Sequence, residues 1–144
     1  MVVTGEVPVV VVGVDGSRNA DVALEWAEQY ATAIGGALRV VVAWEWPLSY
    51  GYPMSFEGFD PRTDAVRVAE KAVAGLSLPS DRIDLETLEG PAGDVLVRAS
   101  DDTDLLVVGL SGNRLVASVL IGSVSAHCVH HAHVPVVVVP TDRT

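Results

Sequence analysis

Short apolar runs rich in valine alternate along this chain with longer segments in which apolar residues recur every three or four positions. Apolar runs of this kind are typical of strands in a parallel sheet whose two faces are both covered by helices. The pattern predicts strands at residues 9–14, 38–44, 83–88, 105–108 and 136–139. It predicts helices at about residues 19–34, 62–76, 92–100 and 123–131. We therefore expect an α/β fold with an open parallel sheet.

Residues 47–61 follow neither the strand period nor the helix period. They are rich in Pro, Gly, Tyr, Phe and Ser, a composition typical of surface loops. We expect a mobile surface excursion between the second strand and the second helix, not a domain linker. The sequence shows no internal repeat and no low-complexity tract, so residues 1–144 are expected to form one domain.

Charge and composition limit the classes of molecule that this protein is expected to bind. The chain carries 9 basic and 19 acidic residues, with a net charge of −10 at pH 7 and no basic run, so nucleic acid and anionic membrane surfaces are poor partners. No apolar run approaches the roughly 20 residues that cross a bilayer. The first residues lack the basic start of a secretory signal, and we expect a cytoplasmic protein. The single cysteine, Cys128, is expected to be a small buried side chain.

Candidate chemistry lies at the carboxyl ends of the first and fourth predicted strands. In an open parallel sheet, ligands bind beyond these ends, where the chain order reverses. The first strand ends in Gly-Val-Asp-Gly-Ser at 13–17, and the fourth ends in Gly-Leu-Ser-Gly at 109–112, before Gly122 and Ser123 open the last helix. Glycines expose backbone N–H groups, and a helix N-terminus carries partial positive charge. The arrangement predicts a seat for an anion, most naturally phosphate.

Two charged side chains refine this prediction. Arg114 is the only side chain nearby in the sequence that adds a cation to the expected seat. Asp15 would face the same ligand, and a carboxylate close to phosphate oxygens is tolerable when it holds a ribose hydroxyl or a divalent metal such as Mg²⁺. The glycine patterns of the P-loop and of dinucleotide-binding folds do not occur at these positions, which excludes both of those phosphate loops.

The spacing of these glycines resembles that of the ATP-binding branch of the universal stress protein family. The family signature, Gly-x2-Gly-x9-Gly-Ser/Thr, is matched by Gly109, Gly112, Gly122 and Ser123 with both spacings intact. The match falls between the fourth strand and the last helix, and Asp15 ends the first strand where the family carries its Asp. The chain also closes with Val-Pro-Val-Val-Val-Val, as such domains usually do. The resemblance covers essentially the whole chain.

This resemblance implies a three-layer fold with a five-stranded parallel sheet in the order 3-2-1-4-5 and helices on both faces, the adenine nucleotide alpha hydrolase-like fold. It implies ATP, or AMP or ADP, as ligand, with Mg²⁺, and a homodimer joined through the last strand. By their positions in the family pattern, Asp15 is implied to contact ribose or the metal, and Gly13 and the backbone near Trp44 are implied to line the adenine site. The residues implied to surround ribose and phosphates are Gly109, Gly112, Asn113, Arg114, Leu115, Gly122, Ser123 and Val124.

Two departures from the family pattern concern loops. The turn at Gly90-Pro91 is one residue shorter than the usual Gly-x-Pro, and residues 47–61 are idiosyncratic. Contacts carried over from other members are therefore not assigned to either segment.

Simpler interpretations stay open for several of these residues. The motif glycines also suit turns, Asp15 suits an Asx turn, and Ser123 suits an N-cap. Trp26 and Tyr30 are expected in the core, while the aromatic residues of 44–52 either stack on adenine or cover the sheet edge. The histidines of 127–133 suit a helix C-terminus better than a metal site, because no carboxylate partner is visible beside them in the sequence.

The expected function is that of a regulatory domain that holds ATP and responds through its conformation or its choice of protein partner. One alternative is an ATP-hydrolysing or phosphate-transferring enzyme, for which Asp15 and Ser111 are the candidate groups. The other alternative is a dimeric scaffold without nucleotide.

Overall fold

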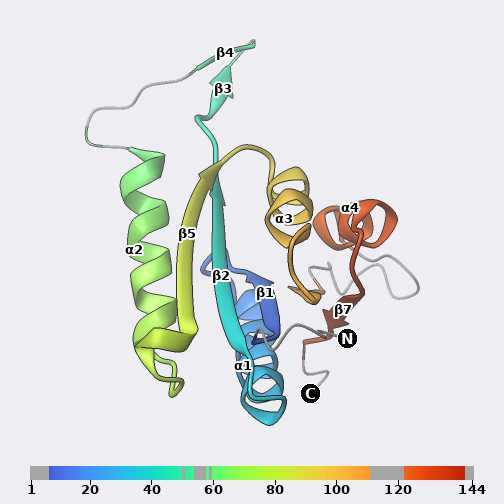
Figure 1. Ribbon diagram of the computed structural model, residues 1–144. Helices are drawn as coiled ribbons and strands as arrows, with labels where there is room; N and C mark the ends of the chain where they lie inside the picture. Colours follow the sequence, from blue (N-terminus) through green and yellow to red (C-terminus); the bar gives the residue numbers. More distant parts are fainter. Residues whose placement is uncertain (1–6, 50, 54–57, 59, 111–121, 142–144) are drawn as a thin grey trace.

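A computed structural model describes residues 7–49, 51–53, 58, 60–110 and 122–141, and it contains a five-stranded sheet covered by helices on both faces (Figure 1). The strands of this sheet are β1 (Val9–Gly13), β2 (Ala37–Trp44), β5 (Ile83–Glu89), β6 (Leu105–Gly109) and β7 (Val136–Val139). Their order is β5-β2-β1-β6-β7, and every neighbouring pair is parallel. The predicted order 3-2-1-4-5 is therefore confirmed.

In the described residues, four helices connect the strands of the sheet. They are α1 (Arg18–Ala33), α2 (Pro61–Ala74), α3 (Ala92–Ser100) and α4 (Ser123–His131), with a short 3-10 turn, η1 (Ser80–Arg82), before β5. The longest of them, α1, has 16 residues. No helix in the described part of the chain is both long enough and apolar enough to span a membrane.

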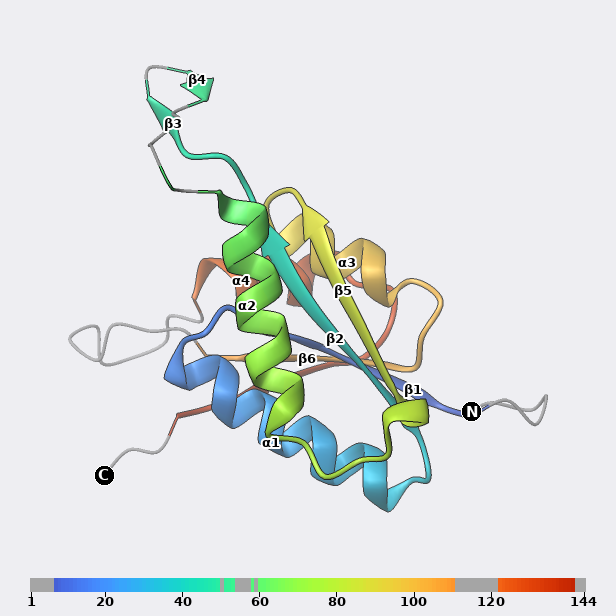
Figure 2. The ribbon, with the colours of Figure 1, turned by 90° about the vertical axis from the view of Figure 1, so that its left-hand side faces the viewer.

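A two-stranded antiparallel hairpin, absent from the sequence-based prediction, lies within residues 47–61. Its strands are β3 (Leu48–Ser49) and β4 (Tyr52–Pro53), each of two residues. The hairpin extends from the body of the protein past the carboxyl end of β2 (Figures 1 and 2). Strands this short carry no readable alternation of polar and apolar residues, which explains why the pattern failed to show them.

Local side chains determine where α1 and α2 begin. The Ser17 hydroxyl accepts a hydrogen bond from the N–H of Ala20 (3.2 Å) and caps α1. Asp60 accepts one from the N–H of Arg62 (2.9 Å), and the Arg62 side chain and N–H together hold the pKa of Asp60 below its usual value. The prediction placed the end of α2 at residue 76, but the helix ends at Ala74 because Gly75 takes the C-cap position.

The alternation of side chains along the strands creates two hydrophobic cores, one on each face of the sheet. Val10 and Val12 of β1 face α1 and α2, whereas Val11 faces α3 and α4, and all three are completely buried. Cys128 of α4 lies fully inside the second core, as predicted, and burial raises the pKa of its thiol to about 11. The central strand is thus shielded from solvent on both faces.

In α1 and α2, the sequence pattern assigned to the buried face residues that the structure leaves exposed. Tyr30 of α1 is 39% exposed and stacks on the partly buried Trp26, with 5.1 Å between the ring centroids, so it lies outside the core. Ile34 and Val66 are 38% and 42% exposed. Small alanines, including Ala23 and Ala27 of α1, are fully buried in the core instead, because a short side chain lets a helix backbone approach a strand.

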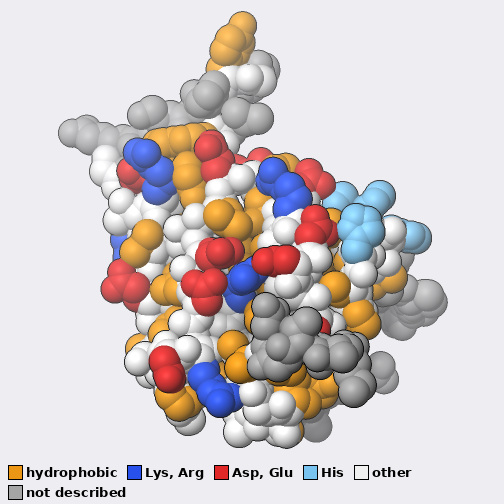
Figure 3. All heavy atoms as spheres, viewed as in Figure 1, with side chains coloured by type: hydrophobic (Ala, Val, Ile, Leu, Met, Phe, Trp, Pro, Cys, Tyr) orange, Lys and Arg blue, Asp and Glu red, His pale blue; other side chains and the backbone are white. Residues whose placement is uncertain are grey.

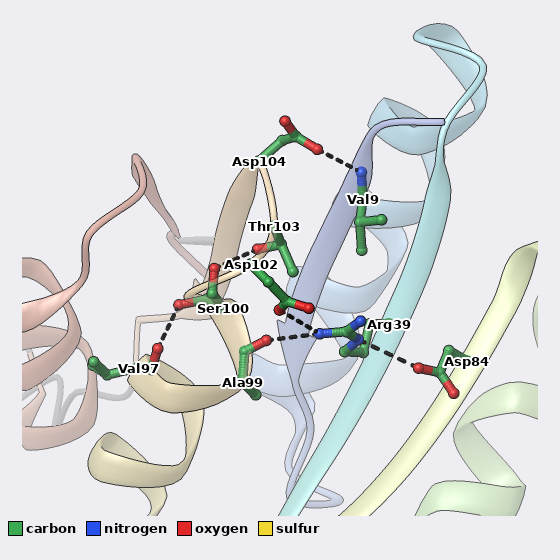
Figure 4. A network of polar contacts seen from close by, with 9 residues as sticks. All are labelled: Val9, Arg39, Asp84, Val97, Ala99, Ser100, Asp102, Thr103 and Asp104. Carbon is green, nitrogen blue, oxygen red and sulfur yellow. Dashed lines mark hydrogen bonds and ion pairs between the residues drawn. The ribbon is translucent and has the colours of Figure 1, made fainter. Parts of the chain in front are cut away.

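Polar contacts connect the sheet to the turn that follows α3 (Figure 4). The guanidinium of Arg39 in β2 donates to the Ala99 carbonyl (2.9 Å) and to Asp102 (3.1 Å), and its Nε lies 3.3 Å from the Asp84 carboxylate. Burial by itself lowers the pKa of Arg39, but the hydrogen bond to Asp102 and the surrounding carboxylates outweigh it and raise that pKa. Asp104 accepts from the N–H of Val9 (2.8 Å), which fixes the start of β1 beside β6.

The first turn of α1 lies directly against the last residue of β6. A Cβ placed on Gly109 would lie 2.4 Å from the carbonyl oxygen of Asn19 and 2.8 Å from its carbonyl carbon. Real Cβ atoms do not approach backbone atoms this closely, and backbone cannot rotate away as a side chain can. Glycine at position 109 is therefore required by helix packing, independently of any ligand.

We predict that Gly109→Ala lowers the free energy of unfolding by about 1–3 kcal/mol, the usual cost of forcing an extra carbon into packed structure. Urea denaturation monitored by circular dichroism measures this change. Gly75→Ala is the matched control, because a Cβ there meets nothing nearer than the Ala72 carbonyl oxygen at 3.8 Å. Equal stability of Gly109→Ala and the wild type would contradict the close packing of α1 on β6.

Candidate functional site

The order of the strands places the chain reversal between β1 and β6, as predicted. From β1 the chain passes to β2 and β5 on one side, and then returns across the sheet to β6 and β7 on the other. A pocket of about 100 Å³ opens at this point, at the carboxyl ends of the strands. Its apolar lining includes Val41, Ala43, Leu96 and Val108, from two strands and α3. Its polar lining consists of Asp15, Ser17 and Asn19.

The turn between β1 and α1 holds Asp15 at the edge of this pocket. One carboxylate oxygen of Asp15 accepts a hydrogen bond from the N–H of Ser17 (2.9 Å), and Gly16 has a φ of +84°, a value that favours glycine. Asp15 is therefore an Asx-turn residue, one of the interpretations that the sequence left open. Asp15 is exposed and lines the pocket as well, so its role in the turn does not bury it.

The N-terminus of α4 forms another side of the site. Gly122, not Ser123, occupies the N-cap position, with φ −58° and ψ 163°, and its carbonyl accepts from the Ala126 N–H (2.9 Å) and the Ser125 hydroxyl (3.0 Å). Within the described residues, no side chain caps the N–H groups of the first turn. Val124 from this turn lines the pocket. The positive end of α4 thus lies beside the apolar lining.

The structure brings together four of the predicted site residues, Gly13, Asp15, Gly109 and Val124, which all line the pocket. Gly112, Asn113, Arg114 and Leu115 lie outside the described residues, as does Ser111. A Cβ on Gly13 would meet the Leu96 side chain at 2.7 Å, so Gly13 leaves room for α3 at the base of the site.

The side chain of Trp44 faces away from the pocket. It packs on the α1 and α2 side of the sheet, whereas Ala43, its neighbour in β2, lines the pocket. The Arg62 guanidinium lies 5.9 Å from the Trp44 ring centroid and 5.8 Å from that of Trp46. These contacts are cation–π interactions, and they support the interpretation in which Trp44 and Trp46 cover the end of the sheet.

The sequence analysis did not identify several residues that line the pocket, among them Val41, Ala43 and Asn19. Val41 and Ala43 were classed only as strand residues, although period-two alternation in β2 places both on the face opposite Trp44. Asn19 was taken only as the first residue of a helix, and its place in the pocket depends on the crossing of α1 over Gly109. Strand alternation in the sequence could have placed Val41 and Ala43 in the pocket. No pattern in the sequence indicates the packing that places Asn19 there.

The histidines gather over α4 (Figure 3). His127 Nε2 lies 2.9 Å from an Asp94 oxygen, and His133 Nδ1 lies 3.0 Å from an Asp101 oxygen. The expectation that these histidines lack carboxylate partners was therefore wrong, because packing of α3 against α4 brings sequence-distant aspartates to them. Among the residues that the structure describes, no three His, Cys, Asp or Glu side chains form a group able to hold a metal ion.

Fold and site together define a doubly wound α/β domain with a ligand pocket at its topological switch point. The sequence model of the universal stress protein family matches residues 7–140, and the chain belongs to that family. A universal stress protein of Mycobacterium tuberculosis H37Rv is 34% identical over 155 residues, an alignment covering 92% of this chain and 48% of the relative. The chain thus spans about half the length of the curated relatives that it matches.

Solved structures of the family share this fold. A universal stress protein in complex with cAMP is 29% identical, with a TM-score of 0.61 over 92% of this chain and 95% of that one. The universal stress protein from Archaeoglobus fulgidus, 22% identical, has a TM-score of 0.69 over 92% of this chain and 98% of that one. The second likeness concerns the fold alone.

Proposed function

We propose that this chain binds an adenine nucleotide at the β1/β6 switch point and serves as a regulatory domain of the cytoplasm, with residues 1–144 as one domain. The observation that carries the proposal is the combination, around one pocket, of an apolar lining, a carboxylate and a helix N-terminus that no described side chain caps. These features suit a purine ring, a ribose and a phosphate respectively. The 29% identical relative in complex with cAMP supports the same ligand class.

ATP is the proposed nucleotide, with AMP and ADP as alternatives. The pocket of about 100 Å³ is smaller than the roughly 300 Å³ or more of typical ligand sites, so its described walls suit only part of such a ligand. We therefore retain contacts from Gly112, Asn113, Arg114 and Leu115 to ribose and phosphates as predictions from the family resemblance. Ser123 and Gly122 belong to the proposed phosphate seat.

Mg²⁺ accompanies ATP in this proposal. The described residues include no cluster of carboxylates that would hold a divalent ion alone. Asp15, which is exposed at the edge of the pocket, is the side chain proposed to hold the ion together with phosphate oxygens. The ion would offset the negative charge between this carboxylate and the phosphates.

An ATP-hydrolysing or phosphate-transferring enzyme is less well supported. Such an enzyme needs a group that positions or deprotonates the attacking nucleophile next to the terminal phosphate. Asp15 is the described candidate, and one of its oxygens already accepts the N–H of Ser17. Nothing in the described site favours catalysis over retention of the nucleotide, and we keep a regulatory role as the proposal. A dimeric scaffold without nucleotide is the remaining alternative.

We predict that Gly122→Ala weakens ATP binding about tenfold, equivalent to about 1.4 kcal/mol. The backbone of Gly122 has a φ of −58°, which alanine adopts readily, so the fold is expected to persist while the added methyl group intrudes on the phosphate seat. Isothermal titration calorimetry with Mg·ATP measures the affinity. Gly75→Ala at the end of α2 is the control. Unchanged affinity in a folded Gly122→Ala protein would remove α4 from the site.

We predict that Asp15→Ala weakens ATP binding in Mg²⁺ and in EDTA, with the larger loss in Mg²⁺ if the carboxylate holds the ion. Asp15→Asn is the matched variant, because its amide oxygen can still accept the Ser17 N–H and keep the turn. If Asp15→Asn loses ATP affinity only in Mg²⁺, the carboxylate binds the metal. If it loses the same affinity in Mg²⁺ and in EDTA, the carboxylate binds ribose. Full affinity of both variants in both buffers would exclude Asp15 from the site.

We further propose a homodimer joined through β7, which lies at one edge of the sheet. Leu110 donates its N–H to the Val139 carbonyl (2.9 Å), so Val139 bonds toward β6. Because bonding directions alternate along a strand, the N–H and C=O of Val138 point away from β6. An apolar edge that no described strand pairs favours pairing with the same strand of a second copy across a two-fold axis.

We predict that Val137→Lys shifts the protein from dimer to monomer in analytical ultracentrifugation. The Val137 side chain packs partly against the core under α1, so Val138→Pro is the second variant, removing an outward N–H while leaving the β6–β7 pairing intact. Circular dichroism checks that both variants stay folded. A wild-type protein that sediments as a monomer at tens of micromolar, roughly where a micromolar association is saturated, would contradict the dimer.

A further inference from the structure

A second and much larger hollow lies between α1 and α2. These two helices lie on the face of the sheet opposite α3 and α4 (Figure 2). This α1/α2 groove has a volume of about 1060 Å³. Its apolar floor includes Leu24 of α1, Val68 and Ala72 of α2, and Leu76. Leu24 is buried and the other three are partly buried, so the groove offers apolar surface that the fold itself leaves incompletely covered.

The two walls of the groove carry opposite charge. Asp21 and Glu25 follow each other at one-turn spacing on α1, and Arg67 and Lys71 do the same on α2. All four side chains are exposed. Among the described residues no ion pair crosses the groove, and the pair that Arg67 makes, at 3.6 Å, is with Asp64 of its own helix. The charges of the two walls are thus available to an occupant.

One end of the groove is closed by a fixed contact, and the other end reaches the nucleotide pocket. Glu28 of α1 accepts the N–H groups of Ser77 and Leu78, which ties α1 to the turn after α2. At the opposite end Gly16 lines the groove, and Val14 lines both the groove and the pocket. An occupant of the groove would therefore touch the same turn that carries Asp15.

We propose that the α1/α2 groove docks a helical segment of a partner protein. The apolar floor requires an apolar stripe on that segment, and the walls require basic residues along one flank and acidic residues along the other. The charges on both walls recur every four residues, so they can pair with charges spaced one turn apart on a docked helix. The wall formed by α1 has 16 residues and is about 24 Å long, so a docked helix of similar length would fit beside it. A nucleic acid or an anionic membrane offers no basic flank for Asp21 and Glu25. Docking in this groove does not require a bound nucleotide, although the occupant touches the turn that carries Asp15.

The test uses a display library of 16-residue helical peptides with a fixed leucine stripe and flank positions free to be Lys, Glu or Gln. The wild-type protein, without nucleotide, is expected to enrich peptides with opposite charges on the two flanks. Asp21→Lys combined with Glu25→Lys makes both walls basic and is expected to enrich peptides with two acidic flanks. Glu70→Lys combined with Asp81→Lys is the matched control, with the same change in charge at exposed positions outside the groove.

Affinity provides the second measurement. A peptide selected on the wild type is expected to bind the Asp21→Lys, Glu25→Lys variant about tenfold more weakly in fluorescence anisotropy, and to bind the control variant unchanged. No enrichment on the wild type, flanks of a single charge, or the same enrichment on the wild type and the reversed variant would overturn the proposal. Because nucleotide is absent throughout, these failures leave the proposed nucleotide site untouched.

Discussion

The burial of β1 on both faces is the constraint on which the rest of the molecule depends. Val10, Val11 and Val12 are fully buried, so helices must cover both faces and neighbouring strands must satisfy the backbone on both sides. Right-handed crossovers then place α1 and α2 on one face and α3 and α4 on the other. The chain has to leave β1 in one direction and return to its other side. The reversal that opens the pocket is thus a consequence of how β1 is buried.

Different structural elements supply the apolar and the polar lining of the pocket. Its apolar lining comes from residues near the carboxyl ends of strands and from α3, where the second core reaches the edge of the sheet. Its polar residues come from the turn before α1 and from the first turn of that helix, and α4 contributes N–H groups that no described side chain caps. A ring and an anion are accommodated by separate parts of the scaffold, so the site needs few charged side chains. This division suits a chain whose net charge is −10.

The sequence predicted what depends on local pattern and missed what depends on long-range packing. Four strands of the main sheet, β1, β2, β6 and β7, are short valine-rich runs, and such runs indicate strands in a helix-covered parallel sheet. The edge strand β5 contains no valine and was predicted from its shorter apolar pattern. The order of the strands came from the family resemblance and is confirmed. Tyr30 was misplaced because a helical stripe does not reveal how closely a helix approaches its sheet. The His127–Asp94 contact joins two helices far apart in the sequence, and no periodicity encodes it.

Gly109 has a consequence for how relatives of this chain are interpreted. It is the first glycine of the motif that resembles an ATP-binding signature, yet the carbonyl of Asn19 already excludes any side chain at that position. A descendant that lost its nucleotide would still be under selection to keep this glycine, for the sake of folding alone. As a diagnostic of ligand binding, position 109 therefore carries little information. The remaining motif positions are the ones whose loss would distinguish an empty scaffold from a nucleotide carrier.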